Sequence, residues 1–183
     1  MRKLLTALLT FLALSAPALA ASLPSVLTLT STTTAYTAGQ FIASNSNGTL
    51  ITVPSFTIQS LTSPSILLPR LHLVSNDTTA ASWNGQTITI DLWTALPTFA
   101  AGSGDRSTFS PATGTGSHFA TYTCLMSTIY GDGSFAECSA STNSPPTLTA
   151  TSPTTLWWTA TATTGSGTTG ASKTLSLTPE AVY

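Results

Sequence analysis

The sequence predicts an all-β fold: a single antiparallel β-sandwich of about nine strands, with a jelly roll as one arrangement of them. Three observations lead to this class. Threonine and serine account for 38 and 25 of the 183 residues, and β-branched threonine favours strands. Apolar residues recur at every second position in many short segments, which is typical of strands with one buried face. Turn signals separate these segments, and no helical apolar stripe follows the N-terminal segment.

The first five strands are expected near residues 26–31, 39–44, 53–61, 66–75 and 86–94. The second ends before the Asn47-Gly48 turn signal, and Asn84-Gly85 precedes the fifth. The other evidence for these strands is alternation of apolar with polar residues, seen at Leu27 and Leu29, Phe56 and Ile58, Leu71 and Leu73, and Ile88, Ile90 and Leu92.

The last four strands are expected near residues 118–128, 134–141, 154–163 and 173–179. The first two flank the Gly131-Asp-Gly133 turn, and Pro145-Pro146 follows them. In the third, Trp158, Ala160 and Ala162 alternate with threonines, and Leu175 and Leu177 mark the fourth. Because no repeat or linker divides residues 21–183, they are expected to form one domain.

The N-terminus has the pattern of a secretory signal peptide over residues 1–20. Arg2 and Lys3 form a positive start, Leu4–Leu14 is apolar, and Ala18-Leu-Ala20 is a small-x-small cleavage site. The apolar run is too short to span a bilayer as a mature helix. The protein is therefore expected to be exported to the periplasm or outside the cell, with no membrane span after cleavage.

The charge of residues 21–183 excludes several partners. Three basic residues stand against six acidic ones, which gives a net charge of −3. So few cations cannot neutralise a row of phosphates, so nucleic-acid binding is not expected, and no polybasic face exists for anionic lipid. Charged residues are only 6% of the chain, so little long-range repulsion opposes packing against copies of itself or against other proteins.

The two cysteines are expected to form a disulfide. Cys124 and Cys138 lie at equal distances from Gly131, so a hairpin turning there would place them opposite each other at a non-hydrogen-bonded pair. An even cysteine count in an exported chain favours the bridge over a reactive thiol. Its 15-residue loop would stabilise the fold by about 3 kcal/mol on the chain-entropy model.

The tryptophans are the strongest candidates for a contact surface. Trp157 and Trp158 are consecutive in a strand, so their side chains must leave opposite faces of the sheet. Trp158 is in phase with the alanines and is expected in the core, whereas Trp157 is expected on the threonine-rich outer face. Trp83 precedes the Asn84-Gly85 turn, a common place for a surface aromatic. An exposed tryptophan suits a subunit contact, favoured here, or stacking on a sugar ring.

No motif assigns a catalytic site, a metal or a cofactor, and the protein is not expected to be an enzyme. His72 and His118 are interpreted as ordinary strand residues, and their spacing makes no zinc site. Asp132 fits a turn rather than a calcium loop. A glycosidase-type pair such as Asp91 and Glu137 would have to be assembled by folding. The sequons at Asn47 and Asn76 matter only in a eukaryotic source.

Two stretches resemble phage virion structural proteins of a small β-sandwich type, found among head and tail decoration genes. The first is Ala35-Tyr-Thr-Ala-Gly-Gln-Phe-Ile42 with Val53-Pro-Ser-Phe-Thr-Ile58. The second is Ile88–Thr98 followed by Asp105-Arg-Ser-Thr-Phe-Ser110. The resemblance implies a structural role and no catalytic residues. The chain departs from it in carrying a signal peptide.

These observations favour a non-enzymatic, exported structural protein, either a virion-like decoration or a surface-assembly subunit that associates with itself or a larger protein assembly. The alternative is a secreted carbohydrate-binding or adhesive module that uses an exposed tryptophan; a secreted hydrolase is a third, weaker option.

Overall fold

A computed structural model describes residues 24–29, 35–44, 52–59, 65–77, 83–99, 104–108, 117–129, 133–149, 153–164 and 173–182. The signal-peptide residues 1–20 lie outside this part of the chain. The described residues form strands and no helix, and every strand pair is antiparallel, which confirms the all-β class. The strands are β1 (Ser25–Thr28), β2 (Phe41–Ile42), β3 (Ser55–Ile58), β4 (Ser65–Ser75), β5 (Thr87–Trp93), β6 (His118–Leu125), β7 (Ser127–Ile129), β8 (Gly133–Ala140), β9 (Thr147–Thr149), β10 (Thr154–Ala162) and β11 (Thr174–Val182).

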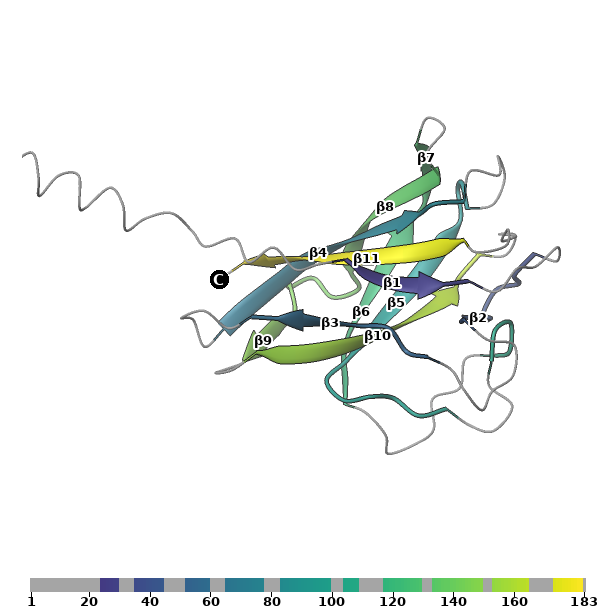
Figure 1. Ribbon diagram of the computed structural model, residues 1–183. Coiled ribbons are helices and arrows are strands. Elements are labelled where there is room, and N and C mark those ends of the chain that lie inside the picture. Colours follow the sequence, from purple (N-terminus) through teal and green to yellow (C-terminus); the bar gives the residue numbers. More distant parts are fainter. Residues whose placement is uncertain are drawn as a thin grey trace, which may run out of the picture.

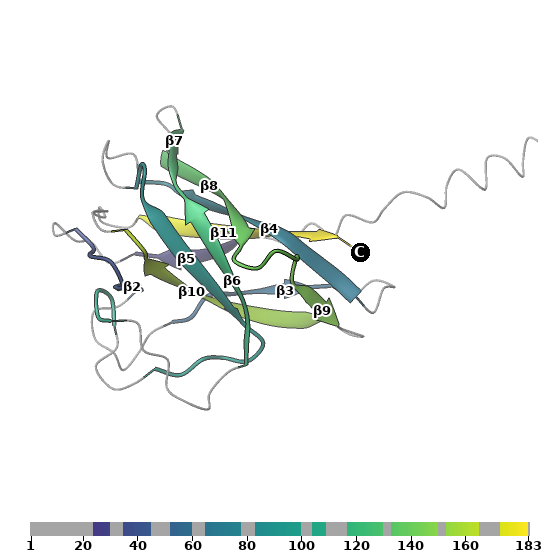
Figure 2. The ribbon, with the colours of Figure 1, turned by 180° about the vertical axis from the view of Figure 1, so that it is seen from behind.

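These strands belong to one hydrogen-bonded sheet, so the two-sheet division of a sandwich is not confirmed. The order across the sheet is β1-β11-β4-β8-β6-β5-β10-β2. Three short strands extend it: β3 pairs with β10, β7 with β8, and β9 with β4. The sheet curls on itself, so that β1 and β11 lie across from β3 and β10 (Figure 1), while β5, β6 and β8 form the wall seen from behind (Figure 2).

The concave side of the curled sheet holds the core. Alternate residues of each strand point inward: Leu71 and Leu73 from β4, Ile88 and Ile90 from β5, and Trp158 from β10 have no measurable exposure. Burying apolar side chains of this size stabilises the fold by about 1.5–3 kcal/mol each. The predicted period-two alternation is therefore the pattern that fills the interior.

Two differences from the predicted strands have local causes. The segment 118–128 is divided into β6 and β7 because Met126 pairs with the turn before β5: its N–H donates to Gln86 O (2.8 Å), and its carbonyl accepts from Gly85 N–H (2.8 Å). β9 was not predicted, because three residues are too few to show an alternation. It pairs with the start of β4, where β8 no longer reaches.

The predicted disulfide is confirmed. Cys124 on β6 pairs directly with Cys138 on β8, with Cα atoms 4.2 Å apart, the spacing of a non-hydrogen-bonded pair. β7 continues the same register against β8, with Ser127 opposite Phe135, so the whole hairpin is symmetric about position 131. Both cysteines are fully buried.

We expect Gly133→Ala to destabilise the protein by about 3 kcal/mol or more, and Gly85→Ala by about 1–2 kcal/mol. Both glycines have positive φ, +113° and +73°, which disfavours alanine. At Gly133 a Cβ would also overlap the backbone oxygen of Ser75, whereas nothing lies within 4 Å of a Cβ at Gly85. Chemical denaturation of both variants measures the difference, and equal losses would contradict the close approach of β8 to the end of β4.

Candidate functional site on the outer face of the sheet

A row of aromatic side chains crosses three strands on the outer face. Trp157 on β10 lies opposite Trp93 on β5, and Trp93 lies opposite His118 on β6. The Trp93 and His118 rings meet edge to face, with centroids 5.1 Å apart. Trp157 is half-buried, whereas Trp93 is only 6% exposed, so Trp157 and His118 present the accessible part of the row.

The next row along the same strands is polar. Asp91 on β5 lies between Thr159 of β10 and Thr121 of β6. The Thr121 hydroxyl donates to Asp91 Oδ1 (2.5 Å), and His118 Nε2 lies 3.1 Å from the same oxygen. Thr159 Oγ1 accepts a hydrogen bond from Trp93 Nε1 (3.1 Å). Polar groups are thus fixed beside the aromatic row.

This cluster does not have the geometry of a nucleophile–base relay. His118 approaches both Asp91 and Thr121 through the same nitrogen, Nε2. A relay needs one ring nitrogen for the nucleophile and the other for the orienting carboxylate. The Thr121 proton is also directed to the carboxylate rather than to the imidazole. The contacts among these three residues therefore lack the two-nitrogen arrangement of a relay.

The structure does not bring Asp91 and Glu137 together as a carboxylate pair. Asp91 pairs with His118, while Glu137, on β8, pairs with Arg70 (3.2 Å) on β4.

His72 lies on the face opposite its neighbouring leucines, as its phase implies, and is 3.9 Å from Glu180. No group of three metal-ligating side chains occurs among the described residues, and Asp132 and Asn47 lie outside them. Asn76 is exposed, and its Oδ1 accepts a hydrogen bond from the Thr174 N–H (2.7 Å).

The adjacent tryptophans are placed as predicted, but Trp83 is not. Trp158 is fully buried, and Trp157 is on the opposite, outer face. Trp83 was expected at the surface and is only 1% exposed, so that prediction is wrong. The Trp83 carbonyl closes the turn by accepting the Gln86 N–H (3.0 Å), and its ring packs on that of Tyr36, with centroids 5.7 Å apart. The turn directs this side chain into the core rather than to solvent.

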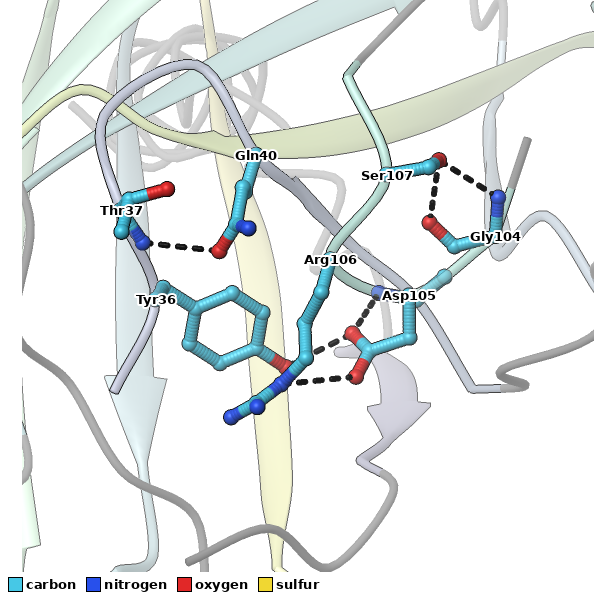
Figure 3. A network of polar contacts seen from close by, with 8 residues as sticks. Tyr36, Thr37, Gln40, Gly104, Asp105, Arg106 and Ser107 are labelled. Carbon is cyan, nitrogen blue, oxygen red and sulfur yellow. Dashed lines mark hydrogen bonds and ion pairs between the residues drawn. The ribbon is translucent and has the colours of Figure 1, made fainter. Parts of the chain in front are cut away.

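A buried polar network that the sequence analysis did not identify fixes residues 104–108 against β2 (Figure 3). Asp105 Oδ1 accepts hydrogen bonds from the Tyr36 hydroxyl (2.7 Å) and from the Ala43 N–H (3.0 Å). The Arg106 guanidinium lies over the Tyr36 ring, 5.1 Å from its centroid, and its Nε is 3.8 Å from Asp105 Oδ2. Backbone bonds between Phe41 and residues 106 and 107 complete the attachment.

Burial controls the electrostatics of this network. It raises the pKa of the Asp105 carboxyl, and the hydrogen bonds from Ala43 and Tyr36 and the nearby Arg106 charge only partly oppose this effect. Burial and the neighbouring Asp105 raise the pKa of Tyr36, which therefore stays a hydrogen-bond donor at neutral pH. Arg106 Nε and Nη2 are buried and have no hydrogen-bond partner among the described residues, and its φ is +68°. The arrangement attaches a loop and leaves little access for a ligand.

No protein-family model matches the chain, and no curated protein matches it. Residues 35–42 and 105–108 meet in the fold, because Tyr36 contacts Asp105 and Gln40 pairs with Thr108. No helix in the described part of the chain is long and apolar enough to cross a membrane.

We expect Trp158→Ala to destabilise the protein by about 3–5 kcal/mol, because it removes a fully buried ring. Trp157→Ala should change the free energy of unfolding by much less, because its ring is partly exposed already. Urea unfolding followed by far-ultraviolet circular dichroism compares the two variants. A larger loss at Trp157 would contradict the assignment of the two faces.

We also expect the stability advantage of Asp105→Asn over the wild type to grow as pH rises. A folded-state pKa above the unfolded value means that the native state holds the proton more tightly. The stability that protonated Asp105 contributes to the fold is therefore complete below the ordinary aspartate pKa of about 4. It is lost as pH rises through the higher folded-state pKa. Asparagine keeps an Oδ1 acceptor for Tyr36 and Ala43 but cannot ionise. Unfolding of both proteins from pH 3 to pH 8 measures the difference, and a constant gap would show that Asp105 does not titrate abnormally.

Proposed function

We propose that this protein is an exported, non-enzymatic structural subunit that associates with copies of itself. The observation that carries the proposal is an outer face that is covered by hydroxyl groups and carries few charged groups. Cross-strand hydroxyl contacts cover this face between Thr89 and Thr163 (2.6 Å), Thr57 and Thr155 (3.2 Å), and Thr123 and Ser141 (3.4 Å). Arg70 forms an ion pair with Glu137 on this face, and Glu180 and Asp91 lie 3.9 Å and 3.1 Å from His72 and His118.

Such a surface opposes association weakly. Sparse and screened charges generate little long-range repulsion, and short hydroxyl side chains lose little conformational entropy when they are covered. The buried Cys124–Cys138 disulfide is compatible with an oxidising location outside the cytoplasm. The resemblance to phage decoration proteins makes a virion-like or surface-assembly coat the specific form that we favour.

The test is the size of the exported protein in solution. Expressed with its N-terminal segment in a secreting host, the protein should begin at Ala21 and sediment as an oligomer at micromolar concentration. The oligomer should persist from 50 to 500 mM salt, because few charges contribute to it. A cytoplasmic protein that keeps Met1 would contradict export, and a monomer at all concentrations would contradict self-association.

A second candidate function, glycan recognition, is favoured by the cluster around Trp157. A partly exposed indole lies beside fixed hydroxyl, carboxylate and imidazole groups, which is the combination that binds a sugar ring and its hydroxyls. Pull-down on chitin, cellulose and peptidoglycan with wild-type, Trp157→Ala and Trp157→Phe proteins distinguishes the candidates. Retention that Phe preserves and Ala abolishes would favour the glycan function.

A further inference from the structure

In the part of the chain that the structure describes, β1 and β3 are two edges of the curled sheet that face each other. Among the described residues, β1 pairs only with β11, and β3 pairs only with β10. Figure 1 shows β1 and β3 running along the two edges. A hollow of about 220 Å³ separates β1 from the chain that leads into β3, and it is lined by Val26, Leu27, Thr28, Ser44, Thr52 and Pro54. The edges therefore approach each other without pairing.

The hydrogen-bond phase of each edge strand identifies the backbone groups that point away from its paired neighbour. Beyond β1 the Leu29 N–H donates to Lys173 O (2.7 Å), so Ser25 and Leu27 direct their backbone groups to β11. The N–H and C=O of Val26 and Thr28 consequently face the open side. On β3, the Trp158 N–H donates to Pro54 O (3.0 Å). Because the phase alternates along the strand, the backbone N–H and C=O groups of Phe56 and Ile58 also point to β10.

Ser55 and Thr57 are therefore the residues of β3 that face the open side. Their side chains point outward and are exposed, as are those of Val26 and Thr28. Leu27 and Phe56, between them, point inward and are buried. Each edge thus has two residues whose backbone groups face the open side. In both strands these residues are two positions apart, and their side chains point outward.

Strand polarity distinguishes between possible occupants of the open edges. β3 is the eighth strand counted from β1 along a fully antiparallel path, so β1 and β3 run in opposite directions. A single added strand would have to be parallel to one of its two neighbours. A second copy related by a two-fold axis parallel to the strands presents its β3 to β1 and its β1 to β3, both antiparallel.

The two edge strands are short, with four residues each, and each directly follows a proline, Pro24 or Pro54, but neither carries a charge. Exposed edges are commonly protected by charged residues, internal prolines or bulges. Ser25–Thr28 and Ser55–Ile58 contain no charged residue and no proline. The edge of β2, in contrast, is covered, because Phe41 exchanges backbone bonds with residues 106 and 107.

We propose that the open edges are the interface between two copies of this chain, with β1 of each copy paired with β3 of the other. In this register Val26 bonds to Thr57 of the second copy, and Thr28 bonds to Ser55 of the second copy. All the free edge groups of these four residues are then satisfied. The inference rests on the proposed self-association and specifies the surface that produces it.

The test is a cysteine pair, Val26→Cys with Thr57→Cys, in the full-length exported protein. Directly opposed residues of a hydrogen-bonded pair have Cα atoms about 5.5 Å apart, within reach of a disulfide. Mild oxidation should give a covalently linked dimer on non-reducing gels, and each single variant should give none. The control pair is Leu96→Cys with Thr57→Cys, because Leu96 is as exposed as Val26 (53% and 51%) but is not on an edge strand.

A disulfide within one chain would show that the edges close on each other, and the absence of any link would also overturn the proposal. A second variant, Thr28→Pro, removes an N–H that β11 does not use, so the monomer should keep its fold. It should weaken self-association at least tenfold in sedimentation. An oligomer that resists both tests would refute this interface while leaving the proposed function standing, whereas a monomeric wild-type protein would refute both.

Discussion

The alternation of side chains along β10 is the constraint on which the rest of the structure depends. It sends Trp158 inward, where the indole N–H donates to Ser25 Oγ (2.9 Å). Ser25 is on β1, at the opposite end of the strand order from β10. This buried hydrogen bond therefore joins the two ends of a curled sheet whose edges are not paired. Because a buried indole N–H without a partner costs about 1–3 kcal/mol, the curl and the position of β1 are coupled to this one ring.

The same alternation sends Trp157 outward and builds the outer face. The neighbouring threonines of β10 follow the same phase and meet polar residues of β5 at each step. The two aromatic residues in succession thus divide their roles: one fills the interior, and the other marks the surface where either a copy or a glycan could bind. A shift of one residue in the register of β10 would exchange these roles and expose the core row.

Features that depend on local pattern were predictable from the sequence. The Cys124–Cys138 pairing followed from symmetry about a turn, and the placement of Trp158 followed from period two. The prediction that Trp83 is exposed was wrong, because its exposure depends on how the following turn places its ring on Tyr36. The Tyr36–Asp105 bond joins residues 69 positions apart, and no spacing rule can reveal such a contact. The single continuous sheet likewise depends on pairings between distant strands, such as β1 with β11.

An unprotected edge is a hazard, because it can template pairing without limit. The geometry of the two edges suggests how this protein avoids that outcome. If β1 paired with β1 of a second copy, the two β3 edges would stay open and further copies could add. Pairing β1 with β3 about a two-fold axis uses these two edges of both copies, so neither of them is left to add further copies. Larger assemblies would then have to grow through the outer face, where sparse charges and hydroxyl groups oppose contact weakly. The edges and the outer face would in that case act at successive levels of one assembly, with the phase of β10 determining both.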